Sequence, residues 1–389
     1  MTRTERLQTG MMVLTGMLVT LVTVAFARLS FGLILPFMRE DLGLSYQAAG
    51  ALGTASALGY LCLVMVAGAF ASRWGGRAAV FIGVALTTAG FVGLSLSSHY
   101  ILLLIYMLLL GFGTAFAYTP VISLLAGAFP QRRGAIIGLT NSGIGLGLLI
   151  ASAVVPYLNT DVSSGWRVTW VAFAIPSAVA VAAVLLFLPR LPVHAGPAIR
   201  IDKGAVYRNR QLIVVGLLYG VIGITYITQA TFMYSFALHA GLPAPTAAKM
   251  AAMMGILSLF AGPLWGMVSD RIGRPRSLLT SVSITLVGTL IPVFWPVFAG
   301  FALHYFILGC TISGMFTSVL AVAGETVEPQ QAPLATSYVT LFFAGGQFLG
   351  PAIAGTMIEH IGFRGTFGIS CIVIAFGIFL TLQLHAAKP

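Results

Sequence analysis

The sequence predicts an all-α membrane protein whose twelve transmembrane helices form two pseudosymmetric six-helix bundles. Composition is the first reason, because 58% of the 389 residues are hydrophobic and only 7% are charged. Soluble domains carry roughly a quarter charged residues. The second reason is that the charges lie between apolar runs, each long enough for a bilayer crossing of ~20 residues. An internal repeat is the third reason, and it divides the helices into two sets of six.

The apolar runs between charges and Pro or Gly breaks predict the helices in order. The first run is far longer than the ~7 to 15 apolar residues of a signal peptide, so we expect it to remain as the first helix. The predicted spans are 11–38, 46–71, 78–97, 101–128, 135–157, 168–189, 211–238, 247–269, 278–295, 300–324, 335–358 and 367–386.

Basic residues predict the orientation of these helices. With the N-terminus inside, 15 Lys and Arg residues face the cytoplasm and 4 face outward, which satisfies the positive-inside rule. The four on the outside are Arg39, Arg167, Lys249 and Arg364. We therefore expect cytoplasmic N- and C-termini. The sequence contains no N-x-[ST] sequon, which fits a bacterial inner membrane.

The two halves of the chain repeat at an offset near 198 residues. Leu42-Gly43-Leu44 corresponds to Ala240-Gly241-Leu242, and Leu110-Gly111 corresponds to Leu308-Gly309. The longest polar segment, Arg190–Arg210, separates the halves. We predict an N-terminal bundle at 1–190, a cytoplasmic linker at 191–210 and a C-terminal bundle at 211–389. Repeated six-helix halves are typical of transporters that rock around a site near the bilayer midplane.

Two cytoplasmic loops share a motif, "GMVSDRIGRPR" at 266–276 and "GAFASRWGGR" at 68–77. The first resembles the loop signature of the major facilitator superfamily, and the second is a weaker copy with Ser72 in place of the acid. The resemblance implies the twelve-helix fold of that family. An acid at a helix end can pair with loop arginines and form a conformational latch. The alternative is a solvated basic loop that serves topology alone. The candidate latch residues are Asp270, Arg271, Arg274, Arg73 and Arg77.

The stretch "GFGTAFAYTPVISLLAGAFPQRRGAIIGLTNSGIGLGLLIASAVVPYL" at 111–158, with "GWRVTW" at 165–170, is similar to one branch of that superfamily. It resembles the monocarboxylate transporters, the oxalate/formate exchangers and their bacterial relatives. Members that handle small carboxylates often have an arginine in span eight, and the oxalate exchangers add a lysine in span eleven. This sequence departs from both, since the stretch "AAMMGILSLFAGPLWGMVS" at 251–269 of span eight is uncharged and span eleven carries only Gln347.

Arg28 is the only charged residue between Met11 and Met38. An arginine near the middle of a span costs about 2.5 to 3.5 kcal/mol on insertion scales. Its Cβ points toward the helix N-terminus, away from the nearer membrane surface, so snorkelling is disfavoured. A water-filled cavity that admits an anion explains its position, because a guanidinium offers two parallel hydrogen bonds to a carboxylate.

Polar and aromatic residues in three other spans complete the candidate binding site. Span seven is unusually polar; Tyr226 and Gln229 share one of its faces, and Tyr226 corresponds to Arg28 in the repeat. Interfacial aromatics and helix–helix hydrogen bonds are the alternative reading, strongest for Tyr234. Together with Arg28, the candidate substrate-binding residues are Tyr118, Tyr226, Gln229 and Gln347.

The same sequence argues against several other classes of protein. The basic residues mark topology rather than a solvated nucleic-acid face. The histidines and the three cysteines are scattered, so no metal, cofactor or disulfide is expected. "GIGLG" lies inside an apolar helix, where Gly134/Gly138 and Gly143/Gly147 favour close helix packing over dinucleotide binding. No catalytic cluster supports an enzyme or a membrane-embedded sensor.

We therefore interpret the chain as a secondary transporter of a small organic anion that works by alternating access, without ATP and as a monomer. The competing hypothesis is a proton-driven exporter of drugs or other amphipathic compounds, although no acid lies deep in span one or four. The carboxylates all lie at or beyond helix ends, so proton symport and anion exchange both stay open. The substrate and the direction of transport are also left open.

Overall fold

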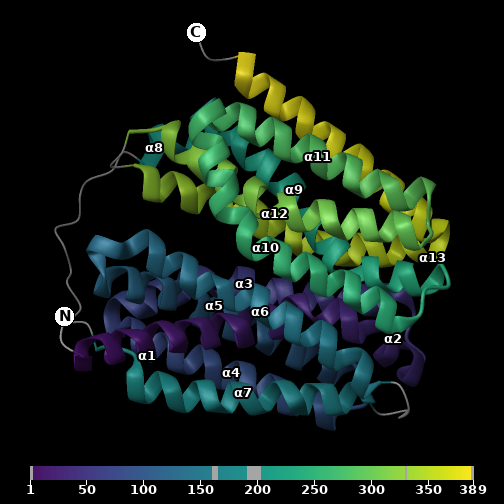
Figure 1. Cartoon of the computed structure of the whole chain (residues 1–389), viewed down its shortest axis with the longest axis horizontal. Coiled ribbons are helices and arrows are strands. Elements are labelled where there is room, and N and C mark those ends of the chain that lie inside the picture. The colour runs from purple at the N-terminus through teal and green to yellow at the C-terminus, as the bar shows by residue number, and fades with distance from the viewer. Residues whose placement is uncertain (1–2, 160–164, 191–202, 329–330, 387–389) are drawn as a thin grey trace. The chain divides into compact units, whose positions relative to one another are not determined.

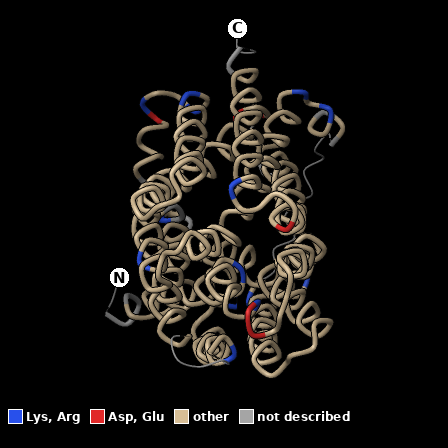
Figure 2. The backbone as a smooth tube through the Cα atoms, turned by 90° about the vertical axis from the view of Figure 1, so that its right-hand side faces the viewer, with Lys and Arg blue, Asp and Glu red and all other residues tan. Residues whose placement is uncertain are grey.

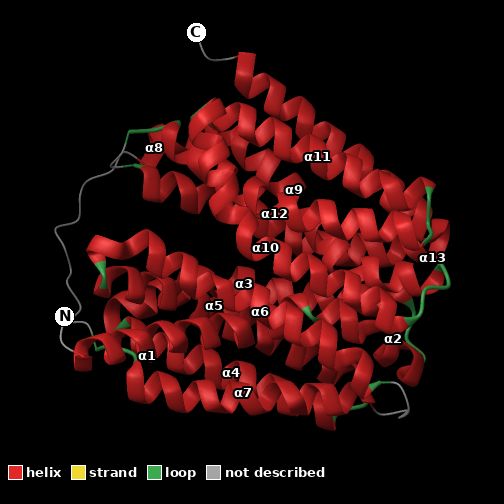
Figure 3. Ribbon diagram, in the orientation of Figure 1, coloured by secondary structure: helices red, strands yellow, loops and turns green. Residues whose placement is uncertain are grey.

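The computed structural model describes residues 3–159, 165–190, 203–328 and 331–386, and this part of the chain is helical apart from short connections and contains no strand (Figure 3). The elements follow one another along the chain as Figure 1 labels them. They are α1 (Arg3–Thr20), η1 (Leu21–Leu29), α2 (Phe31–Leu42), α3 (Tyr46–Trp74), α4 (Gly76–Leu96), α5 (Tyr100–Ala128), η2 (Pro130–Arg132), α6 (Arg133–Leu158), α7 (Gly165–Phe187), α8 (Lys203–Tyr207), α9 (Arg210–His239), α10 (Ala244–Ile272), α11 (Arg274–Phe294), α12 (Phe298–Glu325) and α13 (Ala332–Ala386).

Among the described residues, 11 helical segments are long and apolar enough to cross a membrane. One of them, Leu334–Leu384, has 51 residues and accounts for two crossings. Gly362 interrupts α13 with φ 70° and ψ 178°, a conformation that residues with a Cβ rarely adopt. The twelve predicted spans are thus all present, although spans eleven and twelve join at one glycine instead of a loop. Most of the described chain carries no charge (Figure 2).

The chain divides into two compact units. Unit 1 comprises Met1–Leu44 and Ala51–Pro197, and unit 2 comprises Ser45–Gly50 and Ala198–Pro389. Of the predicted linker, 191–202 lies outside the described residues. The remainder contains α8, a short helix that the sequence analysis did not predict. The predicted domain limits at 190 and 211 stay a prediction.

The repeat seen in the sequence is also present in the helix bounds. Adding 198 to the bounds of α3 gives those of α10, and adding 198 to those of α4 gives those of α11. Gly43 and Gly241 end corresponding helices at φ 61° and φ 88°, and Gly75 and Gly273 have φ 96° and φ 88°. Positive φ is accessible to glycine because it lacks a Cβ. The two halves therefore keep the same turns as well as the same helix lengths.

The first span differs from the uniform helix that the sequence analysis predicted at 11–38. It begins at Arg3 and continues through three segments, α1, η1 and α2, to Leu42. The middle segment, η1, is a π-helix of 9 residues. Arg28 lies in the last turn of η1, so the irregular part of the span contains its only intramembrane charge.

Candidate functional site

The π-helix η1 sets the local geometry around Arg28. It ends at Leu29 and is followed by Ser30, whose amide and hydroxyl both donate to the Ala25 carbonyl at 2.8 Å. The hydrogen bond from the Ser30 amide connects residues five positions apart, which is the spacing of a π-helix. The serine hydroxyl adds a second hydrogen bond that stabilises the wider turn. Short π-helical segments inside α-helices occur frequently at functional sites. Hydropathy does not reveal such a segment, because its residues are as apolar as those of a regular helix.

Three neighbouring helices of unit 1 hold this span in place. Thr114 of α5 donates to the Thr23 carbonyl of η1 at 2.6 Å. Thr20 at the end of α1 donates to the Thr140 carbonyl of α6, also at 2.6 Å. The Phe26 ring stacks on a phenylalanine of α7, Phe173, with centroids 3.9 Å apart. Hydrogen bonds between buried helices cost free energy to break because no water replaces them.

Close packing against α6 completes the support of η1. A Cβ on Gly143 would collide with the Met17 carbonyl, and one on Gly147 would collide with Ala25 of η1. This half of the predicted small-residue pattern is confirmed. Gly138 has no heavy atom within 4 Å of an added Cβ, so the prediction of a packing role is wrong at that position. The surroundings of Gly134 are not among those that the structure describes.

The guanidinium of Arg28 lies over an aromatic ring that the sequence analysis missed. Its Cζ is 4.8 Å from the centroid of Tyr60, which comes from α3 and is 8% exposed. A cation over a tyrosine face is attracted by the ring quadrupole, most strongly where water is excluded. The Tyr60 phenol also forms a side-chain hydrogen bond with Thr119 of α5. The sequence contained one signal for this residue, because Tyr60 is a single tyrosine among small and aliphatic residues.

Tyr118 has a separate partner in unit 1. Its hydroxyl donates to Oδ1 of Asn141 on α6 at 3.4 Å, a long hydrogen bond, and the ring is half-buried. Unit 1 therefore contributes two polar pairs, Arg28 with Tyr60 and Tyr118 with Asn141.

In unit 2 the corresponding helices carry an aromatic cluster, defined as Tyr219, Tyr226, Phe316 and Phe343. The Tyr226 ring meets Phe316 edge-on with centroids 5.2 Å apart. Phe316 meets Phe343 at 5.4 Å, and Phe343 stacks on Tyr219 at 4.5 Å. Such separations and edge-to-face or stacked geometries are favourable for aromatic pairs. The sequence analysis found only Tyr226, although Phe316 corresponds to Tyr118 in the repeat.

The two candidate glutamines of unit 2 are both buried. Gln229 is 6% exposed, and its Oε1 accepts a hydrogen bond from Thr289 of α11 at 3.5 Å. Gln347 is 4% exposed. For Tyr234 the sequence analysis favoured either an interfacial position or a helix–helix hydrogen bond. The residue is only 2% exposed and donates to the Ala244 carbonyl at the start of α10. Its role is thus a helix–helix hydrogen bond.

The loop between α10 and α11 contains a compact ionic network. Arg274 pairs with Asp270 at 2.8 Å and with Glu325 at the end of α12 at 3.4 Å. It also donates to the Ser269 hydroxyl at 3.0 Å. Arg271 is exposed. Within unit 2, the partner of Asp270 is therefore Arg274.

The matching loop of unit 1 is attached without a carboxylate. Ser72 donates back to the Ala69 carbonyl at 2.8 Å within its own helix. Arg73 lies over the Trp74 ring at 4.8 Å, and Arg77 donates to the Leu185 carbonyl at the end of α7. Both loops thus bind a neighbouring helix of their own unit, one through an acid and the other through a backbone carbonyl.

A second polar cluster lies at the opposite end of unit 1. Asp41 accepts hydrogen bonds from the Trp166 indole at 2.8 Å and from Arg167 at 2.7 Å. Arg167 also donates to Ser98 at 2.8 Å. The bond from Trp166 and the bonded, charged Arg167 together lower the pKa of Asp41. The sequence analysis used "GWR" only as a mark of the repeat, so this cluster was missed.

Comparison with known proteins decides the family. The family model described as "Uncharacterised MFS-type transporter YbfB" matches residues 20–384. The chain is a member of the major facilitator superfamily. Human monocarboxylate transporter 11 is 27% identical over 92% of this chain and 79% of its own length. The agnestins efflux protein AgnL12 of Paecilomyces divaricatus is 23% identical over 97% of this chain and 88% of its own length.

A solved structure agrees with the fold. The crystal structure of the nucleoside transporter NupG superposes with a TM-score of 0.77 at 14% identity, covering 97% of this chain and 98% of that one. The predictions of a major facilitator fold and of a transporter rather than an enzyme are confirmed. The protein is a multi-pass membrane transporter. In the part of the chain that the structure describes, no three His, Cys, Asp or Glu residues are grouped so as to hold a metal ion.

Proposed function

We propose that this major facilitator protein is a secondary transporter of a small organic anion, of the mono- or dicarboxylate type, and that Arg28 binds the carboxylate. The observation that carries the proposal is a half-buried arginine on a π-helical turn inside a membrane span, with its guanidinium over Tyr60. A charge held there is costly unless it has a function. The similarity to a monocarboxylate transporter supports the same substrate class.

In this proposal Arg28 and Tyr60 act as a pair. The Tyr60 ring lies against one face of the planar guanidinium, and the edge of a guanidinium is the part that forms two parallel hydrogen bonds with a carboxylate. The support from Thr114 and Phe173 keeps η1 rigid, so the substrate need not order the arginine. Tyr118 adds a hydroxyl that can exchange its long bond to Asn141 for one to the substrate.

The aromatic cluster of unit 2 contributes the apolar part of recognition. Tyr226, Phe316 and Phe343 are each only partly buried, so their rings can contact a substrate's carbon skeleton. We propose that Gln229 and Gln347 contribute hydrogen bonds once the packing around them loosens during the transport cycle. Recognition would then combine one charged group with several aromatic surfaces, which is the composition of typical small-molecule sites.

The transport cycle is proposed to be alternating access in the bacterial cytoplasmic membrane, with both termini in the cytoplasm, as the distribution of basic residues favours. The network of Asp270, Arg274 and Glu325 would hold one conformation and release in the other, while Arg271, Arg73 and Arg77 supply further positive charge. The protein is proposed to act as a monomer. The substrate's own carboxylate can carry the proton in symport, and anion exchange requires no proton.

Export of an amphipathic compound is the second candidate function. It is favoured by the similarity to an efflux protein and by the size of the aromatic cluster. The two candidates differ in direction and in the requirement for a carboxylate. An exporter would accept neutral or cationic amphipathic compounds, whereas the proposed anion transporter would require the negative charge opposite Arg28.

Uptake into proteoliposomes tests the proposal. A panel of mono- and dicarboxylates, their neutral amides and a set of amphipathic cations would be supplied with and without a pH gradient, and with and without internal anion. Carboxylate uptake that depends on either gradient supports the proposal and separates symport from exchange. Transport of the amides or the cations in preference to the acids would assign the protein to the export class.

We also propose that residues 1–190 and 211–389 are two separately folding bundles joined by 191–210. Co-expression of 1–196 with 197–389 should then restore part of the transport activity. Halves that insert and bind each other but transport nothing would contradict this domain assignment.

A further inference from the structure

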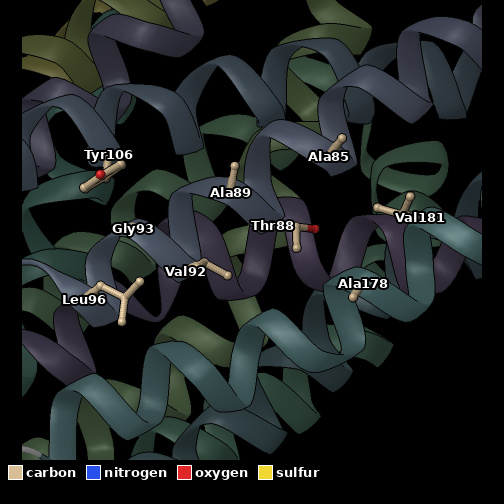
Figure 4. A pocket seen from close by; sticks show the side chains of 9 residues that line it. All are labelled: Ala85, Thr88, Ala89, Val92, Gly93, Leu96, Tyr106, Ala178 and Val181. Carbon is tan, nitrogen blue, oxygen red and sulfur yellow. The ribbon is translucent and has the colours of Figure 1, made fainter.

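An open groove lies on the side of unit 1, outside the proposed substrate site (Figure 4). It has a volume of about 600 Å³, within the ~300 to 1,000 Å³ typical of small-molecule sites. Three helices, α4, α5 and α7, form its walls. The residues that line it are Ala85, Thr88, Ala89, Val92, Gly93, Leu96, Tyr106, Ala178 and Val181.

The groove faces lipid. Val92 is 43% exposed and Leu96 is 80% exposed, and Ala89 and Ala178 are exposed as well. In a protein that crosses the bilayer, exposed apolar side chains on a membrane-spanning helix contact acyl chains. Water does not fill an apolar groove in hydrocarbon, so the occupant must be a lipid chain or an apolar helix.

Small residues of α4 and α7 create the space. The repeat pairs Ala89 of α4 with Val287 of α11, and Gly93 with Ile291. It likewise pairs Thr88 with Leu286. The equivalent helix in unit 2 thus carries bulkier side chains along the same face. At these three positions α4 therefore leaves more room than α11 does.

Tyr106 provides a polar group at one end of the groove, next to Gly93 and Leu96 (Figure 4). Among the described residues, the Tyr106 hydroxyl has no hydrogen-bond partner. A Cβ on Gly93 would collide with the Tyr106 ring, so the glycine makes room for the ring. Thr88, further along, already bonds to Ser177 of α7 at 2.7 Å.

The depth of Tyr106 identifies what its hydroxyl can meet. Helix α5 has 29 residues, or ~43 Å at 1.5 Å per residue. It therefore extends ~7 Å beyond a 30 Å hydrocarbon core at each end. Tyr106 is six residues from the start of α5, or ~9 Å, and lies close to the hydrocarbon boundary. This is the level where tyrosines anchor membrane proteins and where glycerol esters of phospholipids lie.

We propose that this groove binds one acyl chain of a phospholipid, whose ester carbonyl accepts a hydrogen bond from Tyr106. The chain lies along Val92 and Ala89 toward Ala85. The lipid belongs to the leaflet at the N-terminal end of α5, the outer one in the orientation proposed above. A second copy of the protein inserting a helix is the alternative occupant, but it would leave the half-buried Tyr106 hydroxyl without a partner unless it supplied an acceptor at this depth.

Photolabelling in lipid tests the proposal. The full-length transporter is reconstituted in phosphatidylethanolamine and phosphatidylglycerol bilayers with a trace of phosphatidylglycerol that carries a diazirine in one acyl chain. Labelled peptides are then mapped by mass spectrometry. We expect labelling of 85–106 and 178–181 to exceed that of 283–304 by about tenfold, which corresponds to ~1.4 kcal/mol.

Two variants and one control make the result specific. Ala89→Trp should fill the groove and remove the excess labelling, whereas Val287→Trp at the equivalent position of α11 should leave it unchanged. Tyr106→Phe should abolish the preference for ester-linked over ether-linked phospholipid. If Ala89→Trp does not fold, Ala89→Leu replaces it. The Tyr106→Phe measurement does not depend on either Ala89 variant.

Three results would overturn the proposal. The first is equal labelling of α4 and α11, which would indicate surrounding lipid only. The second is unchanged labelling in both the Ala89 and the Tyr106 variants. The third is cross-linking from a photoreactive residue at position 89 to another copy of the chain, which would assign the groove to a protein interface. Transport is not part of this readout, so the outcome is independent of the proposed substrate.

Discussion

The two units share helix bounds and turns but differ in chemistry at corresponding positions. Arg28 of unit 1 corresponds to Tyr226 of unit 2, and Tyr118 corresponds to Phe316. Unit 1 pairs a cation with Tyr60, whereas unit 2 has an aromatic cluster with no charge. The loops between α3 and α4 and between α10 and α11 show the reverse difference, since unit 2 carries the charge there: Asp270 has an ionic partner, whereas Ser72 bonds only to its own helix. Duplication therefore preserved the backbone while the side chains took separate roles.

The largest expected effect is at Arg28. Arg28→Ala removes the only charge of the first span between Met11 and Met38. It also removes the two charge-assisted hydrogen bonds that we propose Arg28 forms with the substrate. Uptake of carboxylates should fall at least ~100-fold, since hydrogen bonds to charged groups contribute about 1.5 to 3 kcal/mol each. Arg28→Lys should retain weak transport, because lysine keeps the charge but loses the planar fork.

The control is the folded state of the variant. Arg28→Ala should stay monodisperse with a melting temperature close to that of the wild type, because the Thr114, Thr20 and Phe26 contacts that hold η1 are intact. Normal uptake by Arg28→Ala, or its failure to fold, would make the arginine structural and remove the main support for an anion substrate.

The aromatic cluster should have the next largest effect. Phe316→Ala removes the ring that contacts both Tyr226 and Phe343, so the substrate loses apolar contact and the cluster loses its geometry. We expect the half-saturating substrate concentration to rise about tenfold, given ~0.5 to 1.5 kcal/mol for aromatic pairs in addition to buried area. Phe316→Tyr, which copies the unit 1 residue, should change it little. Equal effects of both substitutions would contradict a role for aromatic surface alone.

The sequence predicts those parts of the fold and of the candidate site that depend on local signals in the chain. Hydropathy and the positive charges predict the number of spans. Gly43/Gly241 and Leu110-Gly111/Leu308-Gly309 indicate the repeat, because both signals are local. The π-helix of the first span is not predictable in this way, because it depends on Thr114 and Gly147 from other helices. Tyr60 and Phe343 were missed for the same reason, since only tertiary packing brings them to Arg28 and Phe316.

The loop networks provide a smaller test of the comparison. Asp270→Asn keeps the shape of the side chain but removes the charge that pairs with Arg274. Turnover should fall by about two- to fivefold, since exposed ion pairs contribute ~0.2 to 1 kcal/mol. Ser72→Ala should reduce turnover less. Initial rates at saturating substrate measure both, and equally small effects would show that the loops serve topology only.

The smallest expected effect concerns Asp41 and stability. Because Trp166 and Arg167 lower its pKa in the folded state, Asp41 stabilises the protein above its unfolded pKa of ~3.9, and this contribution is lost as the pH falls through the folded value. Asp41→Asn should therefore lower the melting temperature slightly at pH 7, corresponding to ~1 kcal/mol or less. The difference from wild type should shrink below pH ~4. A constant difference from pH 7 to pH 3 would contradict this assignment.

The most direct test of the account compares a carboxylic acid with its neutral amide as ligands of the purified protein. Wild type should bind the acid at least ~10-fold more tightly than the amide, since that ratio corresponds to only ~1.4 kcal/mol. The preference should disappear in Arg28→Ala and survive in Phe316→Ala, because we propose that unit 1 recognises the charge and unit 2 the carbon skeleton. An acid-over-amide preference that persists in Arg28→Ala would contradict the claim that Arg28 binds the carboxylate.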